Sequence, residues 1–150
     1  MNEISIRELK EQAKIMRKTA LTMIYKAQSG HPGGSMSAAD IVTALYFKEM
    51  NIDPKNPKWE DRDRFVLSKG HVCPILYSAL GLKGYFNPSY FDTLRKKGSI
   101  LQGHPDMKKC PGIDISTGSL GQGLACGVGM AIAAKLDGRD YRVFVAVGDG

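Results

Sequence analysis

Two short apolar runs constrain the fold of this chain more than any other feature of its sequence. They read RFVLS at residues 64–68 and RVFVAV at residues 142–147, and a glycine follows each within two residues. A strand that is apolar on both faces is buried on both faces, which is typical of parallel sheets covered by helices. The two runs therefore predict an α/β fold, with a parallel sheet flanked by helices.

Helical patterns occupy much of the chain around these runs. Residues 5–29 carry apolar side chains at helical spacing, and Ser5 and Glu8 have the spacing of a capping box. The other predicted elements are a helix from about Ser37 to before Asp53, a helix after Pro74 to about Leu82, a helix beginning at Asn87 and Pro88, a brief extended piece near residues 113–115 and a helix over residues 120–136.

The predicted helix over residues 120–136 is rich in glycine and alanine. One helical face contains Gly123 and Gly127, and another contains Ala125 and Gly129. Small side chains let a helix approach its neighbours closely, so both faces are predicted to pack tightly.

Composition excludes several classes of protein. An apolar fraction of 43% and a charged fraction of 24% are ordinary for a globular protein. The first residues lack the apolar core of a signal peptide, and the longest apolar run, residues 124–134, is too short to span a bilayer. The three cysteines form no CxxC pair, which argues against a disulfide framework or a zinc ribbon. We therefore expect a cytoplasmic protein without a membrane partner.

The net charge of +6 points to anionic ligands. Charge alone does not distinguish nucleic acid from phosphorylated metabolites. The basic clusters are short, the longest being residues 95–97, and aromatic residues do not alternate with basic ones as in RNA-binding proteins. A nucleic-acid partner is therefore not expected.

Each of the three histidines directly follows a glycine, and two of them precede a proline. The segments are Gly30-His31-Pro32, Gly70-His71 and Gly103-His104-Pro105. Glycine has no Cβ to block a close approach, and proline biases the preceding residue toward an extended conformation. The pattern favours imidazoles held at fixed angles beside a ligand. A three-histidine zinc site and three unrelated histidines remain alternatives at this point.

Two glycine-containing segments suggest anion and metal binding. The loop STGSLGQG at residues 116–123 leads into a helix and could offer free N–H groups to an anion. It lacks the spacing of a Rossmann motif and of a P-loop, so a helix start shaped by packing is equally compatible. Asp149 lies in Gly-Asp-Gly after the second strand, where a carboxylate could bind a hard cation such as Mg²⁺ or form a simple turn.

Taken in order, five segments of the chain resemble the N-terminal, diphosphate-binding region of transketolase. They are SGHPGGSMSAADIVTALYF, RDRFVLSKGHVCPILYSAL, LQGHPD, GIDISTGSLGQGLACGVGMAIAAKL and VFVAVGDG. The resemblance extends from about Lys18 to Gly150. Ser119 stands where many single-chain transketolases have proline, a form most similar to the N-terminal subunit of a split transketolase.

This resemblance implies a thiamine diphosphate-binding fold that is incomplete at its C-terminus. Residues 1–150 would be the N-terminal part of the diphosphate domain, a single truncated domain. The implied reaction moves a two-carbon ketol (glycolaldehyde) unit from a ketose phosphate to an aldose phosphate, with pentose phosphates as the default substrates. The implied cofactors are thiamine diphosphate and Mg²⁺ or another divalent cation.

The resemblance also assigns roles to the three histidines. His31 and His104 would be catalytic, contacting the sugar and the reacting carbons and assisting proton transfer. His71 would donate a hydrogen bond to the cofactor's diphosphate.

Five further residues receive cofactor or metal roles by the same resemblance. Gly118 and Leu120, with Ser119 between them, would contact the cofactor. Asp149 would bind the metal, and the amide of Gly150 would contact the diphosphate. In this family an asparagine further along the chain completes the metal site.

Finally, the resemblance implies a partner. Family active sites lie between a diphosphate domain and a pyrimidine-binding domain of different chains, so we expect a hetero- or homo-oligomer that includes a C-terminal transketolase subunit. The 150 residues alone are expected to be inactive. The alternative is a non-catalytic, truncated subunit that binds phosphorylated ligands or docks on a complete transketolase.

Overall fold

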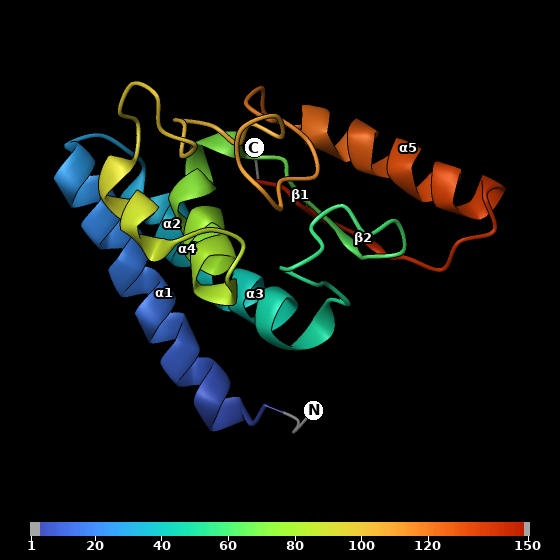
Figure 1. Cartoon of the computed structure of the whole chain (residues 1–150), viewed down its shortest axis with the longest axis horizontal. Coiled ribbons are helices and arrows are strands. Elements are labelled where there is room, and N and C mark those ends of the chain that lie inside the picture. Colours follow the sequence, from blue (N-terminus) through green and yellow to red (C-terminus); the bar gives the residue numbers. More distant parts are fainter. Residues whose placement is uncertain (1–3, 149–150) are drawn as a thin grey trace.

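A computed structural model describes residues 4–148, in which a two-stranded parallel sheet lies between helices (Figure 1). Strand β1 (Arg64–Leu67) pairs with β2 (Val143–Ala146), and Phe65 lies opposite Phe144. Helix α5 (Gln122–Leu136) packs on one side of the strands, and the N-terminal helices pack on the other. The predicted α/β fold with a parallel sheet and flanking helices is confirmed.

The alternation of side chains along the strands divides the protein into two layers of packing. Phe65, Leu67, Phe144 and Ala146 join the main core beneath the N-terminal helices. The intervening side chains face the other way, and Val145 approaches α5. Both faces of the sheet are therefore covered, which explains why the strands are apolar throughout.

The main core is built by α1 (Ile6–Ala27), α2 (Pro32–Ser37), α3 (Ala39–Ala44) and α4 (Cys73–Lys83). Helix α1 begins with the predicted capping box: the N–H of Glu8 donates to Ser5 Oγ, and the N–H of Ser5 donates to Glu8 Oε2. Its buried stripe of Met16, Ala20 and Met23 faces the core, and α4 is its main contact.

The helical region after α1 starts earlier than predicted. We expected a helix from about Ser37, but α2 begins at Pro32, and the π-helical turn η1 (Leu45–Glu49) follows α3. Proline suits the first helical turn because its missing N–H would have no partner there. Gly34 is required inside α2 because a Cβ at this position would lie 2.6 Å from Val72 Cγ2.

The extended piece predicted near residues 113–115 forms no strand. The Asp114 carboxylate lies there instead, accepting the N–H of Phe65 at 2.7 Å and Arg62 Nη2 at 2.5 Å. Burial raises the pKa of Asp114, and the hydrogen bond from Phe65 and the charge of Arg62 oppose that rise. A side chain, rather than a third strand, thus satisfies this N–H of β1.

Two short 3₁₀ turns complete the described elements. Turn η2 (Gly70–Val72) runs directly into α4, and η3 (Pro88–Thr93) begins where a helix start was predicted. Asn87 caps η3 by accepting the N–H of Ser89 at 2.9 Å.

Only one of the two small-residue faces of α5 packs within the described chain. A Cβ on Gly127 would lie 2.4 Å from Val145 Cγ2, and one on Gly123 would lie 2.9 Å from Ser68 Cα. A Cβ on Gly129 would meet nothing within 4 Å. The same outward side presents large apolar side chains to solvent, namely Leu124, Val128, Ile132 and Leu136.

The cysteines carry no disulfide. Cys73 and Cys110 are buried free thiols, and Cys126 is an exposed one, in agreement with the sequence. Within residues 4–148 no helix combines the length and the apolar character needed to cross a membrane.

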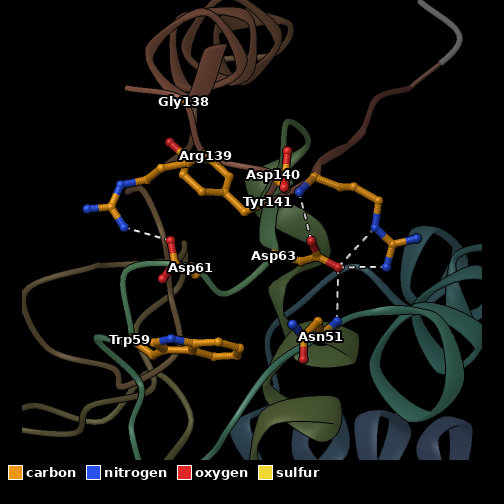
Figure 2. A pocket seen from close by; sticks show the side chains of 9 residues that line it. Asn51, Trp59, Asp61, Asp63, Gly138, Arg139, Asp140 and Tyr141 are labelled. Atoms are coloured by element: carbon orange, nitrogen blue, oxygen red, sulfur yellow. Dashed lines mark hydrogen bonds and ion pairs between the residues drawn. The ribbon is translucent and has the colours of Figure 1, made fainter. Parts of the chain in front are cut away.

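The amino ends of the two strands are joined by a buried carboxylate (Figure 2). Asp63 accepts the N–H groups of Asn51 at 2.9 Å and Arg142 at 2.7 Å, and its Oδ2 also accepts Arg142 Nη2 at 2.7 Å. Burial alone would raise the pKa of Asp63, but these hydrogen bonds outweigh it and hold the pKa below its usual value. The carboxylate is thus stabilised in its charged form.

We expect Asp63→Asn to lower the free energy of unfolding by about 2–3 kcal/mol, because two backbone N–H groups and the half-exposed guanidinium of Arg142 lose a buried, ionised acceptor. The contribution of Asp63 is present above about pH 4, the ordinary carboxyl pKa, and is lost as pH falls through the lowered pKa. Unfolding the complete subunit in urea, repeated across several pH values, measures both effects.

Asp61→Asn is the matched control for this prediction. Asp61 lines the same surface pocket as Asp63 and also pairs with an arginine, with Oδ1 2.6 Å from Arg139 Nη1, but its side chain is 57% exposed (Figure 2). Exposed ion pairs contribute little, so the change should stay within about 0.5 kcal/mol. Equal losses for the two variants would contradict the role given to Asp63.

Candidate functional site

The carboxyl ends of the strands bring together the loops that carry the sequence motifs. Beyond β1, the N–H of Ser68 donates to Ala146 O at 2.8 Å, and Ser68 O accepts the N–H of Gly121 at 3.3 Å. One residue thus connects both strands to the glycine-rich loop before α5. In open α/β sheets, ligands bind at this edge.

Two of the three histidines lie in direct contact. The rings of His31 and His71 meet edge to face, with centroids 4.9 Å apart. His31 precedes the first residue of α2, and His71 lies in η2, so the two come from separate loops. Gly34 adjoins the pair, since a Cβ there would lie 3.8 Å from His71 Nε2.

His104 lies against the glycine-rich loop. A Cβ on Gly118 would lie 3.7 Å from His104 Cδ2, an ordinary contact. Both residues are exposed, as are Ser119 and Leu120. The structure therefore places His104 beside the loop expected to contact a cofactor.

Gly70 lies where the segment of His71 meets the glycine-rich loop beside His104. A Cβ on Gly70 would lie 2.8 Å from Thr117 O and 3.0 Å from Gly118 N, so the backbones of the two loops are in direct contact. Only glycine permits this approach. The segment carrying His71 is thereby held against the segment carrying Gly118.

Three buried hydroxyl oxygens at this end have no hydrogen-bond partner within the described part of the chain. They are Ser35 Oγ, Ser68 Oγ and Thr117 Oγ1. Buried polar atoms in native proteins are nearly always satisfied by protein, water or ligand. Ser68 and Thr117 adjoin the contact at Gly70, so this edge fits a polar group such as a diphosphate.

The charge state of His71 follows from its surroundings. Burial lowers the pKa of His71, and the neighbouring His31, His104 and Lys69 lower it further. The imidazole is therefore neutral at pH 7 and carries one N–H donor. A neutral imidazole can donate a hydrogen bond to an anionic ligand, and the protein does not have to bury a positive charge on the histidine.

No metal cluster forms among these residues. Across residues 4–148 no group of three or more His, Cys, Asp or Glu side chains could hold a metal ion, so the three histidines do not form the zinc site left open by the sequence. Asp149 and Gly150 lie outside the described residues. The surface pocket of Figure 2 lies at the amino ends of the strands and is separate from the three histidines.

Sequence reasoning missed the hydroxyl groups. Ser35 ends the segment SGHPGGS, Ser68 ends the first strand and Thr117 opens TGSLGQG, so each adjoins a recognised motif. Their position in those motifs could have marked these three residues as candidates for the site. Their burial without partners became visible only in the folded chain.

Comparison with known proteins identifies the family of this chain. Residues 9–144 match the family described as transketolase, thiamine diphosphate binding domain. The chain is 50% identical to the 6-deoxy-6-sulfo-D-fructose transketolase subunit SqwG of Clostridium sp. (strain MSTE9), over 95% of this chain and 52% of that protein. It is 47% identical to one of the apulose-4-phosphate transketolase subunits of Phocaeicola vulgatus, over 98% of this chain and 52% of that protein.

A solved structure supports the same relationship. The transketolase of Campylobacter jejuni subsp. jejuni superposes with a TM-score of 0.91 at 38% identity, over 98% of this chain and 24% of that chain. The two relatives named as subunits share more residues with this chain than the solved transketolase does. The chain spans about half the length of those two relatives. By its sequence and its fold, this chain belongs to the transketolase family, in its thiamine diphosphate-binding domain.

Proposed function

We propose that this chain is the cofactor-binding part of a transketolase that moves a two-carbon ketol unit from a ketose phosphate to an aldose phosphate. The observation that carries the proposal is the convergence of His31, His71 and His104 with the loop at residues 117–118. These groups come from separate loops and meet beside unpartnered buried hydroxyls. Membership in the thiamine diphosphate-binding family identifies the cofactor class.

The residues at this edge divide into cofactor-binding and catalytic groups. His71 donates its N–H to the diphosphate, and the exposed residues Gly118, Ser119 and Leu120 of the neighbouring glycine-rich loop contact the cofactor. Asp149 and the amide of Gly150, which lie outside the described residues, are assigned to Mg²⁺ and to the diphosphate on the resemblance in sequence. When bound, thiamine diphosphate supplies the electron sink that stabilises the transferred carbon unit.

His31 and His104 act on the sugar. Both side chains are exposed at the carboxyl edge of the sheet, where a substrate can reach them. An imidazole can donate a hydrogen bond to a sugar oxygen and can move a proton as that oxygen changes charge. We therefore assign to these two histidines the hydrogen bonding and proton transfer at the reacting carbons.

A second chain completes this active site. We propose that the 150 residues are the N-terminal part of a diphosphate domain, and the coverage of about half of the two subunit relatives supports this. We propose a partner subunit with the pyrimidine-binding domain. The free thiols fit the reducing cytoplasm, which we propose as its location.

The test is a two-carbon transfer assay on the complete subunit purified with its partner. Activity should require thiamine diphosphate and a divalent cation. Pentose phosphates are the default substrates, and activity on them would place the enzyme in the pentose phosphate pathway. The assay should also include 6-deoxy-6-sulfo-D-fructose and apulose 4-phosphate, because the names of two relatives specify these sugars.

In the same assembly, His71→Ala should raise the Kd for thiamine diphosphate about tenfold or more, because a hydrogen bond to a charged group is lost. Calorimetric titration with the cofactor measures the change. Unchanged affinity would remove His71 from the diphosphate site. Cofactor binding without transfer of any of these sugars would favour the alternative, a non-catalytic subunit that docks on a complete transketolase.

A further inference from the structure

Side chains of helix α4 lie within hydrogen-bond distance of the loop that carries His104, residues 102–104. The Tyr77 hydroxyl lies 3.0 Å from Gln102 O and 3.0 Å from His104 O, within hydrogen-bond distance of both. Cys73 Sγ lies 3.2 Å from Gly103 O, between those two carbonyls. Three successive backbone carbonyls thus face donors from a single helix.

The spacing of the two donors on α4 explains how they reach the same loop. Cys73 and Tyr77 are four residues apart, so they lie on one face of the helix. Both are fully buried, as is the helix from Cys73 to Gly81. A buried helix without exposed turns is a rigid support for a loop.

The same helix also holds His71. Turn η2, which contains His71, ends at Val72, and α4 begins at Cys73. Helix α4 therefore holds both histidines: His71 lies at its amino end, and the loop of His104 contacts its first turns. The relative position of the two imidazoles depends on the contacts between α4 and residues 102–104.

Both donors keep their protons under physiological conditions. Burial raises the pKa of the Cys73 thiol to about 12. Burial also raises the pKa of Tyr77 well above its usual value. The hydroxyl and the thiol therefore remain able to donate, although a thiol is the weaker donor.

We propose that Tyr77, assisted by Cys73, is a positioning residue that sets the place of His104. The Tyr77 hydroxyl donates one hydrogen bond shared between the carbonyls of Gln102 and His104, and the Cys73 thiol donates to the carbonyl of Gly103. The inference rests on the catalytic role proposed for His104. Tyr77 is buried beneath the loop and acts on the reaction only through it. Small displacements of a catalytic group reduce the rate strongly, so the effect should appear in kcat.

The experiment compares Tyr77→Phe, His104→Ala and the double variant in the complete enzyme with its partner. Phenylalanine keeps the ring and removes only the hydroxyl. We expect Tyr77→Phe to lower kcat on the order of tenfold while leaving the Kd for thiamine diphosphate within about twofold. The double variant should be no slower than His104→Ala, because the hydroxyl has nothing left to position.

Tyr85→Phe is the matched control. It removes a tyrosine hydroxyl from the same domain, but the Tyr85 ring packs against Gly112 instead of the His104 loop. It should keep the parent kcat. If Tyr85→Phe lowers kcat as much as Tyr77→Phe, the loss reflects general packing and the proposal is wrong.

The outcomes separate this inference from the proposed function. If His104→Ala leaves kcat unchanged, the catalytic role of His104 fails and the inference fails with it. If His104→Ala is slow but Tyr77→Phe is not, only the inference is overturned, and multiplicative effects in the double variant also overturn it.

Should Tyr77→Phe not fold, Cys73→Ala is expected to lower kcat about twofold to threefold and Cys73→Ser to restore it. Parent kcat in Cys73→Ala would then overturn the proposal.

Discussion

Gly70→Ala will abolish measurable binding of thiamine diphosphate. The added Cβ would lie 2.8 Å from Thr117 O, 2.9 Å from Thr117 C and 3.0 Å from Gly118 N. All three are backbone atoms, so no side-chain rotation relieves the overlap, and one loop must move. That movement separates His71 from Gly118, the two sides of the proposed diphosphate site. Calorimetric titration of the complete enzyme with the cofactor measures the loss.

Gly33→Ala provides the control for this substitution. Gly33 also lies in a histidine segment, but a Cβ there would meet nothing within 4 Å. The variant should bind the cofactor with parent affinity. Unfolding midpoints of both variants show whether a loss is local or global. A Gly70→Ala enzyme with normal cofactor affinity would refute the assignment of this edge to the diphosphate.

His104→Ala should lower kcat on the order of 100-fold or more, the usual contribution of a group that transfers a proton in the transition state. The affinity for thiamine diphosphate should stay within about twofold of the parent. His104 is exposed beside Gly118, so removing its ring opens no buried cavity. Steady-state kinetics at saturating cofactor measure kcat, and titration measures the Kd.

His71→Ala is the reciprocal control, because its main loss is expected in cofactor affinity. The two histidines therefore have opposite signatures in Kd and kcat. If His104→Ala weakened the cofactor tenfold and left kcat intact, the roles assigned to His71 and His104 would have to be exchanged.

Local patterns predicted most of the secondary structure. The stripe and capping box of α1 and the two strands were found within a residue or two of their predicted bounds. These features depend on neighbours two to four positions apart, which the sequence displays directly. The errors arose where a distant contact prevailed. Gly34 stays helical beside Val72, and Asp114 takes the N–H of Phe65 where an extended piece was expected.

The sequence predicted which histidines would belong to the site, but it did not predict the contacts that bring them together. The repeated Gly-His segments and their resemblance to transketolase named His31, His71 and His104 without any coordinates. The unpartnered hydroxyls of Ser68 and Thr117 and the hydrogen bonds of Tyr77 were not visible in the sequence. Serine, threonine and tyrosine are common residues whose meaning depends on what surrounds them.

The chain's order of residues specified its strands, its helices, its glycine-flanked histidines and its family. Folding specified which of those segments touch: His71 against His31, Gly70 against Thr117, and Tyr77 beneath the His104 loop. Residues 77 and 104 are joined by a hydrogen bond that no short-range pattern encodes. Such contacts depend on how all the packed elements fit at once, because a loop takes its position from the buried helix and sheet beneath it.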